Sequence, residues 1–128
     1  MSLYNKYKVS AATTSNPIDQ FILIFDEIIK LLHQSIKCME IGDIEGKYKH
    51  LDKVTDVLHV LRSGIDVENN EEVKYLAQFY EVAIRKIDKI NFKTEDIAGI
   101  TEVIKAVASV RDTIAALAKE ESKEEVIR

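Results

Sequence analysis

The sequence predicts an all-α protein, an antiparallel up-down four-helix bundle with an N-terminal arm. Apolar residues recur at spacings of three and four along four long segments, which is the period of a helix with one buried face. Four glycines and one proline in 128 residues are too few for the many turns of a β-sandwich or barrel. Short connections between helices of similar length favour antiparallel neighbours. We therefore expect residues 1–128 to form one domain.

The first helix is predicted from Asn16-Pro17 to about Ile41. Asparagine caps the free N–H groups of a helix, and proline at the first helical position loses no hydrogen bond. Gly42 and Asp43 are then expected to end this helix and cap the next one.

The three later helices have equally clear boundaries. The second is predicted from about Ile44 to Arg62, with Gly64 directly after it. Asn69, with Glu72 three residues later, resembles a capping box for the third helix. Thr94 is expected to cap the fourth helix.

Two terminal segments are predicted to lie outside the bundle. Residues 1–15 lack a strong period, and we expect them to form a mobile arm that includes Tyr4 and Tyr7. Residues 119–128 are charged and are expected to fray.

Composition excludes several functional classes. The net charge is −4, with 18 basic and 22 acidic residues interspersed, so there is no electrostatic footprint for nucleic acid. The single cysteine, Cys38, excludes an internal disulfide and fits a reducing compartment. No signal peptide and no apolar run of roughly 18 residues is present, so we expect a cytoplasmic protein without membrane insertion.

The first helix has more apolar surface than one stripe requires. Its main stripe consists of Phe21, Ile22, Phe25, Ile28, Ile29, Leu32, Ile36 and Met39. Ile24, Leu31 and Cys38 form a second strip beside it, each seven residues after the last. The third helix shows a similar surplus, and from it we select Tyr75 and Val82.

Two interpretations of this surplus remain open. The first helix is covered by three neighbouring helices, or two helices share a groove that a partner segment or the protein's own arm fills. On the second interpretation, Leu31→Asp abolishes partner binding and leaves the melting temperature nearly unchanged. A third possibility is a homodimer that buries the strip.

The sequence offers little for catalysis or metal binding. Di-metal bundles need a Glu-x-x-His pair from each of two helices, and the nearest approach, Asp56-x-x-His59, occurs once. No metal, cofactor or enzymatic activity is therefore expected. The HVLRSG segment from His59 to Gly64 does resemble a histidine phosphotransfer domain of bacterial signalling, which is the alternative function. Asp56 would repel a phosphoryl group there. Gly64 is predicted to end the helix, whereas in such a domain the helix continues past this glycine.

Arg111 falls inside the apolar stripe of the fourth helix. A buried guanidinium is costly unless it is paired. We expect either that its stem lies on apolar surface with the head in water, or that an internal or ligand carboxylate meets it.

An ordered set of short motifs resembles the FliS family, the flagellar export chaperones of flagellin. The motifs, in chain order, are Tyr7, Ser15-Asn16-Pro17, Ile24-Phe25-Asp26, Gly42-Asp43-Ile44, Leu61-Arg-Ser-Gly-Ile65-Asp66, Tyr75-Leu76-Ala-Gln-Phe79-Tyr80, Arg85-Lys-Ile87, Asn91-Phe92 and Val110-Arg111-Asp112. They run from Tyr4 to about Leu117. Three positions depart from the family pattern: Asn69-Asn70 replaces Gly-Gly, Ile114 replaces tryptophan and Glu27 replaces glycine. The chain thus resembles a divergent member.

The resemblance implies a cytosolic chaperone that holds the disordered C-terminal segment of flagellin in apolar grooves. It also implies that the protein prevents premature polymerisation and delivers flagellin to the flagellar export apparatus. The partner-binding residues expected on this basis are Ile24, Leu31, Cys38, Tyr75 and Val82. Tyr4 and Tyr7 of the arm are expected to occupy the groove when no flagellin is bound.

Overall fold

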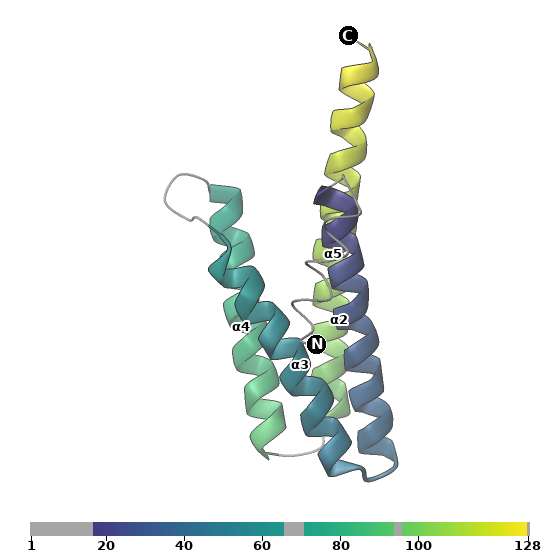
Figure 1. Cartoon of the computed structure of the whole chain (residues 1–128), viewed down its shortest axis with the longest axis vertical. Coiled ribbons are helices and arrows are strands. Elements are labelled where there is room, and N and C mark those ends of the chain that lie inside the picture. The colour runs from purple at the N-terminus through teal and green to yellow at the C-terminus, as the bar shows by residue number, and fades with distance from the viewer. Residues whose placement is uncertain (1–16, 66–70, 94–95, 128) are drawn as a thin grey trace.

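Four α-helices make up the described part of the molecule. The computed structural model describes residues 17–65, 71–93 and 96–127, and no β-strand occurs among them. The helices are α2 (Pro17–Glu40), α3 (Ile44–Ser63), α4 (Glu71–Lys93) and α5 (Ile97–Ile127) (Figure 1). The predicted all-α four-helix fold is confirmed. The caps predicted at Asn16 and Asn69 lie outside the described residues, as do Tyr4 and Tyr7.

The turn between α2 and α3 is fixed by a network of hydrogen bonds. The Asp43 N–H donates to the Cys38 carbonyl at 2.8 Å and the Gly42 N–H donates to the Met39 carbonyl at 3.3 Å, which together form a Schellman motif. Gly42 has φ 75°, in the left-handed region. The Asp43 carboxylate then accepts from the Gly46 N–H at 2.9 Å and caps α3.

Gly42→Ala is expected to destabilise the protein by about 1 kcal/mol, because a side chain at positive φ is strained. Gly64 provides a matched control, since it follows α3 with φ −83°, and an added Cβ there would make only ordinary contacts of 3.6 Å or more. Gly64→Ala should be neutral or stabilising by a few tenths of a kcal/mol. Urea unfolding monitored by circular dichroism measures both. Equal midpoints for the two variants would contradict the structural role given to Gly42.

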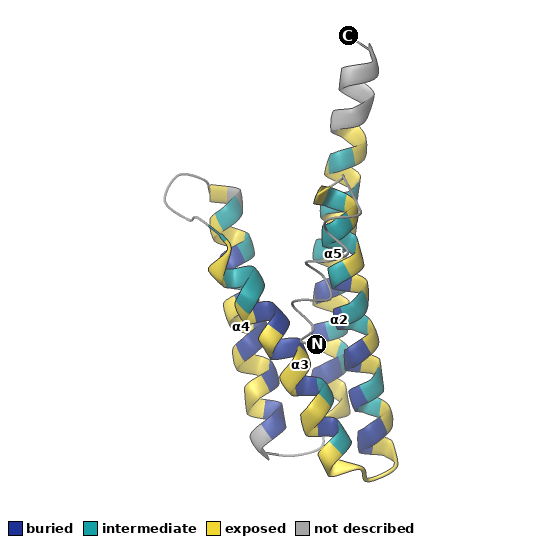
Figure 2. Cartoon of the chain, viewed as in Figure 1, coloured by how far each residue is buried: buried dark blue, intermediate teal, exposed yellow. Residues whose placement is uncertain are grey.

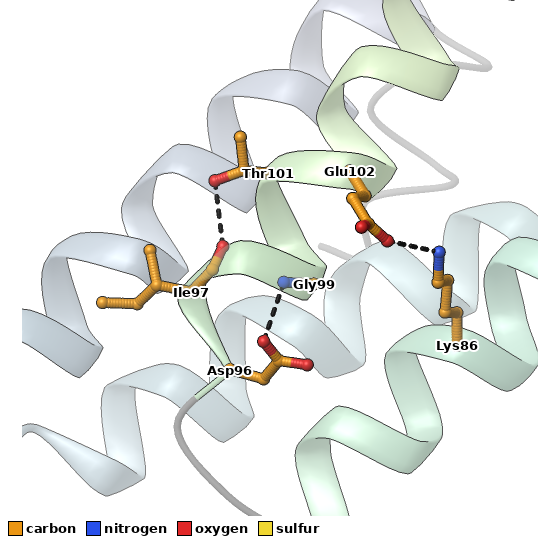
Figure 3. A network of polar contacts seen from close by, with 6 residues as sticks. All are labelled: Lys86, Asp96, Ile97, Gly99, Thr101 and Glu102. Atoms are coloured by element: carbon orange, nitrogen blue, oxygen red, sulfur yellow. Dashed lines mark hydrogen bonds and ion pairs between the residues drawn. The ribbon is translucent and has the colours of Figure 1, made fainter.

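The cap of α5 differs from the sequence prediction. The Asp96 carboxylate accepts a hydrogen bond from the Gly99 N–H at 2.8 Å (Figure 3), which makes Asp96 the capping residue. Thr94 lies outside the described residues. α5 continues to Ile127 and so includes most of the charged segment 119–128, whose fraying stays a prediction.

The core lies where all four helices run together. Figure 2 shows the buried residues concentrated in the lower part of the view, below the level at which the α3–α4 pair diverges from α2 and α5. The fully buried large side chains are Tyr80, Phe25, Ile28, Leu32, Leu51, Leu58, Ile87, Ile100, Val54 and Val107. An aromatic cluster joins α2 to α4: the Phe25 ring centroid lies 4.1 Å from that of Phe21, 6.4 Å from that of Phe79 and 6.3 Å from that of Tyr80.

Two polar contacts connect α3 with α4 in reversed order. Arg62 Nε lies 3.0 Å from Glu81 Oε1, and Asn91 Nδ2 donates to Asp52 Oδ1 at 3.1 Å. The later residue of α3 therefore contacts the earlier residue of α4, as expected of neighbours that run in opposite directions. α2 packs against α3 and α5, α3 packs against α4, and the contact between α4 and α5 is the least extensive of the four. The α4–α5 boundary is thus the least closed side of the bundle.

Candidate functional site

An apolar groove of about 500 Å³ lies between α4 and α5. Its lining residues come from the first half of α4 and the second half of the described part of α5: Val73, Tyr75, Leu76, Phe79, Ser109, Val110, Thr113, Ile114 and Leu117. No charged side chain is among them. We call this surface the α4–α5 groove.

The alignment of the two helices explains why these residues meet. Lys86 Nζ lies 2.7 Å from Glu102 Oε2 and joins α4 to α5 (Figure 3). Residues 7 and 11 positions away share the same helix face. Seven residues back from Lys86 and seven on from Glu102 lie Phe79 and Ser109, and both line the groove.

The groove has a firm floor and exposed rims. On the floor, Leu76, Phe79 and Val110 are partly buried and pack against the core. At the rims, Tyr75 is 73% exposed and Leu117 is 51% exposed. The hydroxyl of Thr113 donates to the Ser109 carbonyl at 2.9 Å, so this polar group is already satisfied. Burying these exposed side chains against a partner would remove apolar surface from water, which is favourable.

The apolar strip predicted on α2 is covered by the bundle. Leu31 is 5% exposed and Cys38 is 8% exposed, while Ile24 is partly buried and packs against the core. α2 packs against α3 and α5, and its Phe25 contacts the aromatic rings of α4. Of the two interpretations, coverage by neighbouring helices fits the burial of these three side chains better than an open groove. The expectation that Leu31→Asp leaves the melting temperature unchanged does not fit this burial.

The two residues selected on α4 have the exposure that a binding surface needs. Tyr75 lines the groove, and Val82, which is 52% exposed, lies seven residues later on the same face. Val82 is not among the lining residues and lies between the groove and Lys86.

Several groove residues were not selected from the sequence. Leu76, Phe79, Val110, Ile114 and Leu117 are not among the binding residues expected from the sequence. The available signal was the spacing of Val110, Ile114 and Leu117, which continues the stripe of α5 beyond Val107.

Arg111 is paired with an internal carboxylate, which was one of the alternatives left open. Its Nη1 lies 3.0 Å from Asp26 Oδ1 on α2, and its Nε lies 3.8 Å from Asp112 Oδ1. The Arg111 side chain is 36% exposed, so we expect this partly solvated pair to contribute little more than about 1 kcal/mol. It connects α2 to α5 and needs no ligand.

Cys38 is expected to react slowly with thiol reagents. Burial raises the pKa of its thiol, and the neighbouring Asp43 carboxylate raises it further. Since the thiolate is the reactive form, alkylation by iodoacetamide at about pH 8 should be at least tenfold slower in the folded protein than in urea. Equal rates in the two conditions would show that Cys38 is accessible. The pKa of Cys38 is higher in the folded protein than in the unfolded chain. The free energy of unfolding is therefore unaffected by this thiol at neutral pH and falls as the pH rises past the unfolded pKa.

The described histidines and acidic residues give no support for a metal site or for the phosphotransfer alternative. No group of three His, Cys, Asp or Glu side chains suited to a metal ion occurs among the described residues. His59 is exposed on α3, and Gly64 ends that helix as predicted, unlike the glycine of phosphotransfer domains. Among the described helices, none carries an apolar stretch that would cross a bilayer.

Comparison with known proteins identifies the family of this chain. The family model described as flagellar protein FliS matches residues 1–121. The flagellar secretion chaperone FliS of Vibrio cholerae serotype O1 (strain ATCC 39315 / El Tor Inaba N16961) is 26% identical over 118 residues, covering 89% of this chain and 87% of that protein. The chain therefore belongs to the FliS family and is a flagellar export chaperone.

Proposed function

We propose that the protein binds the C-terminal segment of flagellin in the α4–α5 groove. The observation that carries the proposal is an uncharged apolar groove on the least closed side of a FliS-family bundle. In the cytosol this binding keeps flagellin from polymerising, and the complex delivers flagellin to the flagellar export apparatus. The chemistry is non-covalent binding, with no catalysis and no cofactor.

The exposed rims supply the binding energy. Fully burying a Leu- or Phe-sized side chain contributes roughly 1.5–3 kcal/mol before ordering costs. Tyr75 and Leu117 start largely exposed and gain a large part of this, and Val82 adds to it where the bound segment extends toward Lys86. Leu31 and Cys38 are buried in α2, so we assign them a structural role and not direct contact with flagellin.

A disordered segment suits such a groove. It loses conformational entropy on binding, which lowers its affinity per unit area but permits it to wrap around the bundle and to be released later. We further propose that the N-terminal arm, through Tyr4 and Tyr7, occupies the same groove in the absence of flagellin.

Isothermal titration of the full chain with a synthetic peptide of the flagellin C-terminal segment tests the function. We expect a micromolar or tighter Kd, corresponding to about −8 kcal/mol or more. A peptide of the same composition in scrambled order is the control. Deleting residues 1–15 should tighten binding, because the arm no longer competes. Absence of binding by the intact and the arm-deleted chain, or equal binding of the scrambled peptide, would contradict the proposal.

A further inference from the structure

The relative position of α4 and α5 depends on few contacts. Theirs is the least extensive contact between two packed helices of the bundle. Where α5 begins, the two helices approach closely, since a Cβ added at Gly99 would lie 2.9 Å from Ile90 Cδ1. Farther along, Lys86 Nζ and Glu102 Oε2 meet at 2.7 Å (Figure 3). Among the described residues, no other ion pair or side-chain hydrogen bond joins α4 to α5.

The ion pair lies between this close approach and the α4–α5 groove. From the close approach to the ion pair, the contacts step four residues back along α4 and three residues forward along α5. Seven further residues in the same senses lead to Phe79 and Ser109, which line the groove. At 1.5 Å per residue, the pair is thus roughly 10 Å from the beginning of the groove. The pair therefore restricts how far, and in what register, the two helices part where the groove opens.

The charges around the pair are mainly positive. The exposed charged residues within four positions of Lys86 or Glu102 on their own helices are Arg85, Asp88, Lys89 and Lys105. Lys89 and Lys105 lie one turn after the pair on the same helix faces, and no ion pair of the described residues involves either of them. Removing the Glu102 carboxylate would leave Lys86 and Lys105 without an anion between them. Removing the Lys86 ammonium still leaves Lys105 within one turn of Glu102, so Glu102 is the more important partner.

We propose that Lys86 and Glu102 are positioning residues for the α4–α5 groove. Their ion pair holds α4 and α5 in the separation and register that the bound segment requires. No charged side chain lines the groove, so the pair acts through the two helices and not by contact with the segment. The inference rests on the proposed function and adds to it which residues keep the groove in its binding form.

A weak ion pair is sufficient for this role. The side chains of Lys86 and Glu102 are 48% and 65% exposed, so the pair contributes little to the stability of the fold. A segment that fits one alignment of the helices loses affinity in proportion to the fraction of molecules that hold that alignment. The contact between α4 and α5 offers little else to maintain it. A loss of affinity, and not a loss of stability, is therefore the diagnostic result.

The Arg62–Glu81 ion pair provides the matched control. Its N···O distance is 3.0 Å, its side chains are 33% and 49% exposed, and it joins α3 to α4. Like the Lys86–Glu102 pair it is partly solvated, and none of the four residues lines the groove. A charge reversal in either pair should lower stability by a similar small amount. A difference in affinity would then report the location of the pair between α4 and α5.

Isothermal titration of the full chain with the flagellin C-terminal peptide is the first test. Glu102→Lys should weaken binding about fivefold or more, and Lys86→Glu should weaken it less, because Lys105 remains. Exchanging both charges in one chain should return the affinity to within about twofold of wild type. Arg62→Glu should also stay within about twofold. Urea midpoints establish that each variant is folded, and Glu102→Gln, expected to weaken binding about threefold, takes the place of Glu102→Lys if that variant does not fold.

Amide chemical shifts of the isotope-labelled free chain are the second test, and they need no flagellin. Glu102→Lys should shift residues 73–79 and 109–117, the charge exchange should reverse most of these shifts, and Arg62→Glu should leave residues 109–117 unchanged. Unchanged groove amides in Glu102→Lys, a charge exchange that restores neither shifts nor affinity, or an equal loss of affinity in Arg62→Glu would overturn the inference. Failure of the wild-type chain to bind the peptide would contradict the proposed function, and the free-chain shifts would still decide the role of the pair.

Discussion

Leu31→Asp is expected to unfold most of the protein at 25 °C. The side chain is 5% exposed and belongs to the hydrophobic core. Losing a buried leucine costs about 2–5 kcal/mol, and burying a carboxylate without a partner adds several more or forces its protonation. Since the free energy of unfolding of a domain is about 5–15 kcal/mol, this one change removes a large part of the stability. Loss of the helical circular dichroism signal, or a large fall in the urea midpoint, measures the effect.

Tyr75→Asp is the matched control, because it introduces the same carboxylate at a residue that is 73% exposed. Its urea midpoint should differ from wild type by about 0.5 kcal/mol or less. If Leu31→Asp kept a cooperative transition near the wild-type midpoint, the placement of Leu31 in the core would be wrong. The apolar strip of α2 would then be a binding surface after all.

Tyr75→Asp combined with Leu117→Asp is expected to weaken binding of the flagellin C-terminal peptide by about 100-fold or more. Both residues line the rims of the α4–α5 groove. Each loses an apolar contact worth roughly 1.5–3 kcal/mol and places a carboxylate where the complex excludes water. Isothermal titration with the full chain measures the change, and circular dichroism establishes that the variant is folded. Val82→Asp should have a smaller effect of about tenfold or less, since Val82 lies beyond the lining residues.

Leu23→Asp supplies the control for binding. Leu23 is 46% exposed on α2 and is not part of the groove lining, so a carboxylate there should leave the affinity within about twofold. A double groove variant that is folded and binds as tightly as wild type would show that flagellin uses another surface.

The helices could be predicted from the sequence because apolar periodicity and capping residues act locally along the chain. The stripes of apolar residues, and Gly42 followed by Asp43, act within a few residues of the chain, so α2 and α3 begin and end close to the predicted positions. The start of α5 was less certain, since Thr94 and Asp96 are both capping residue types and lie two positions apart. The Asp96 hydrogen bond to Gly99 identifies the cap of α5.

The binding surface was only partly predictable, because it depends on which helices are neighbours. The spacing of Ile24, Leu31 and Cys38 correctly indicates a second apolar strip on α2, but periodicity does not say which helix covers it. Packing against α3 and α5 buries the strip. The groove combines residues 73–79 with residues 109–117, and the contact of Lys86 with Glu102 relates the two helices. A single sequence contains no record of that alignment.

The most direct measurement is an amide chemical-shift titration of the isotope-labelled full chain with the flagellin C-terminal peptide. We expect the largest shifts at residues 73–79 and 109–117, with residues 40–45 unchanged. Saturating shifts that leave both groove segments unchanged would contradict flagellin binding in the α4–α5 groove.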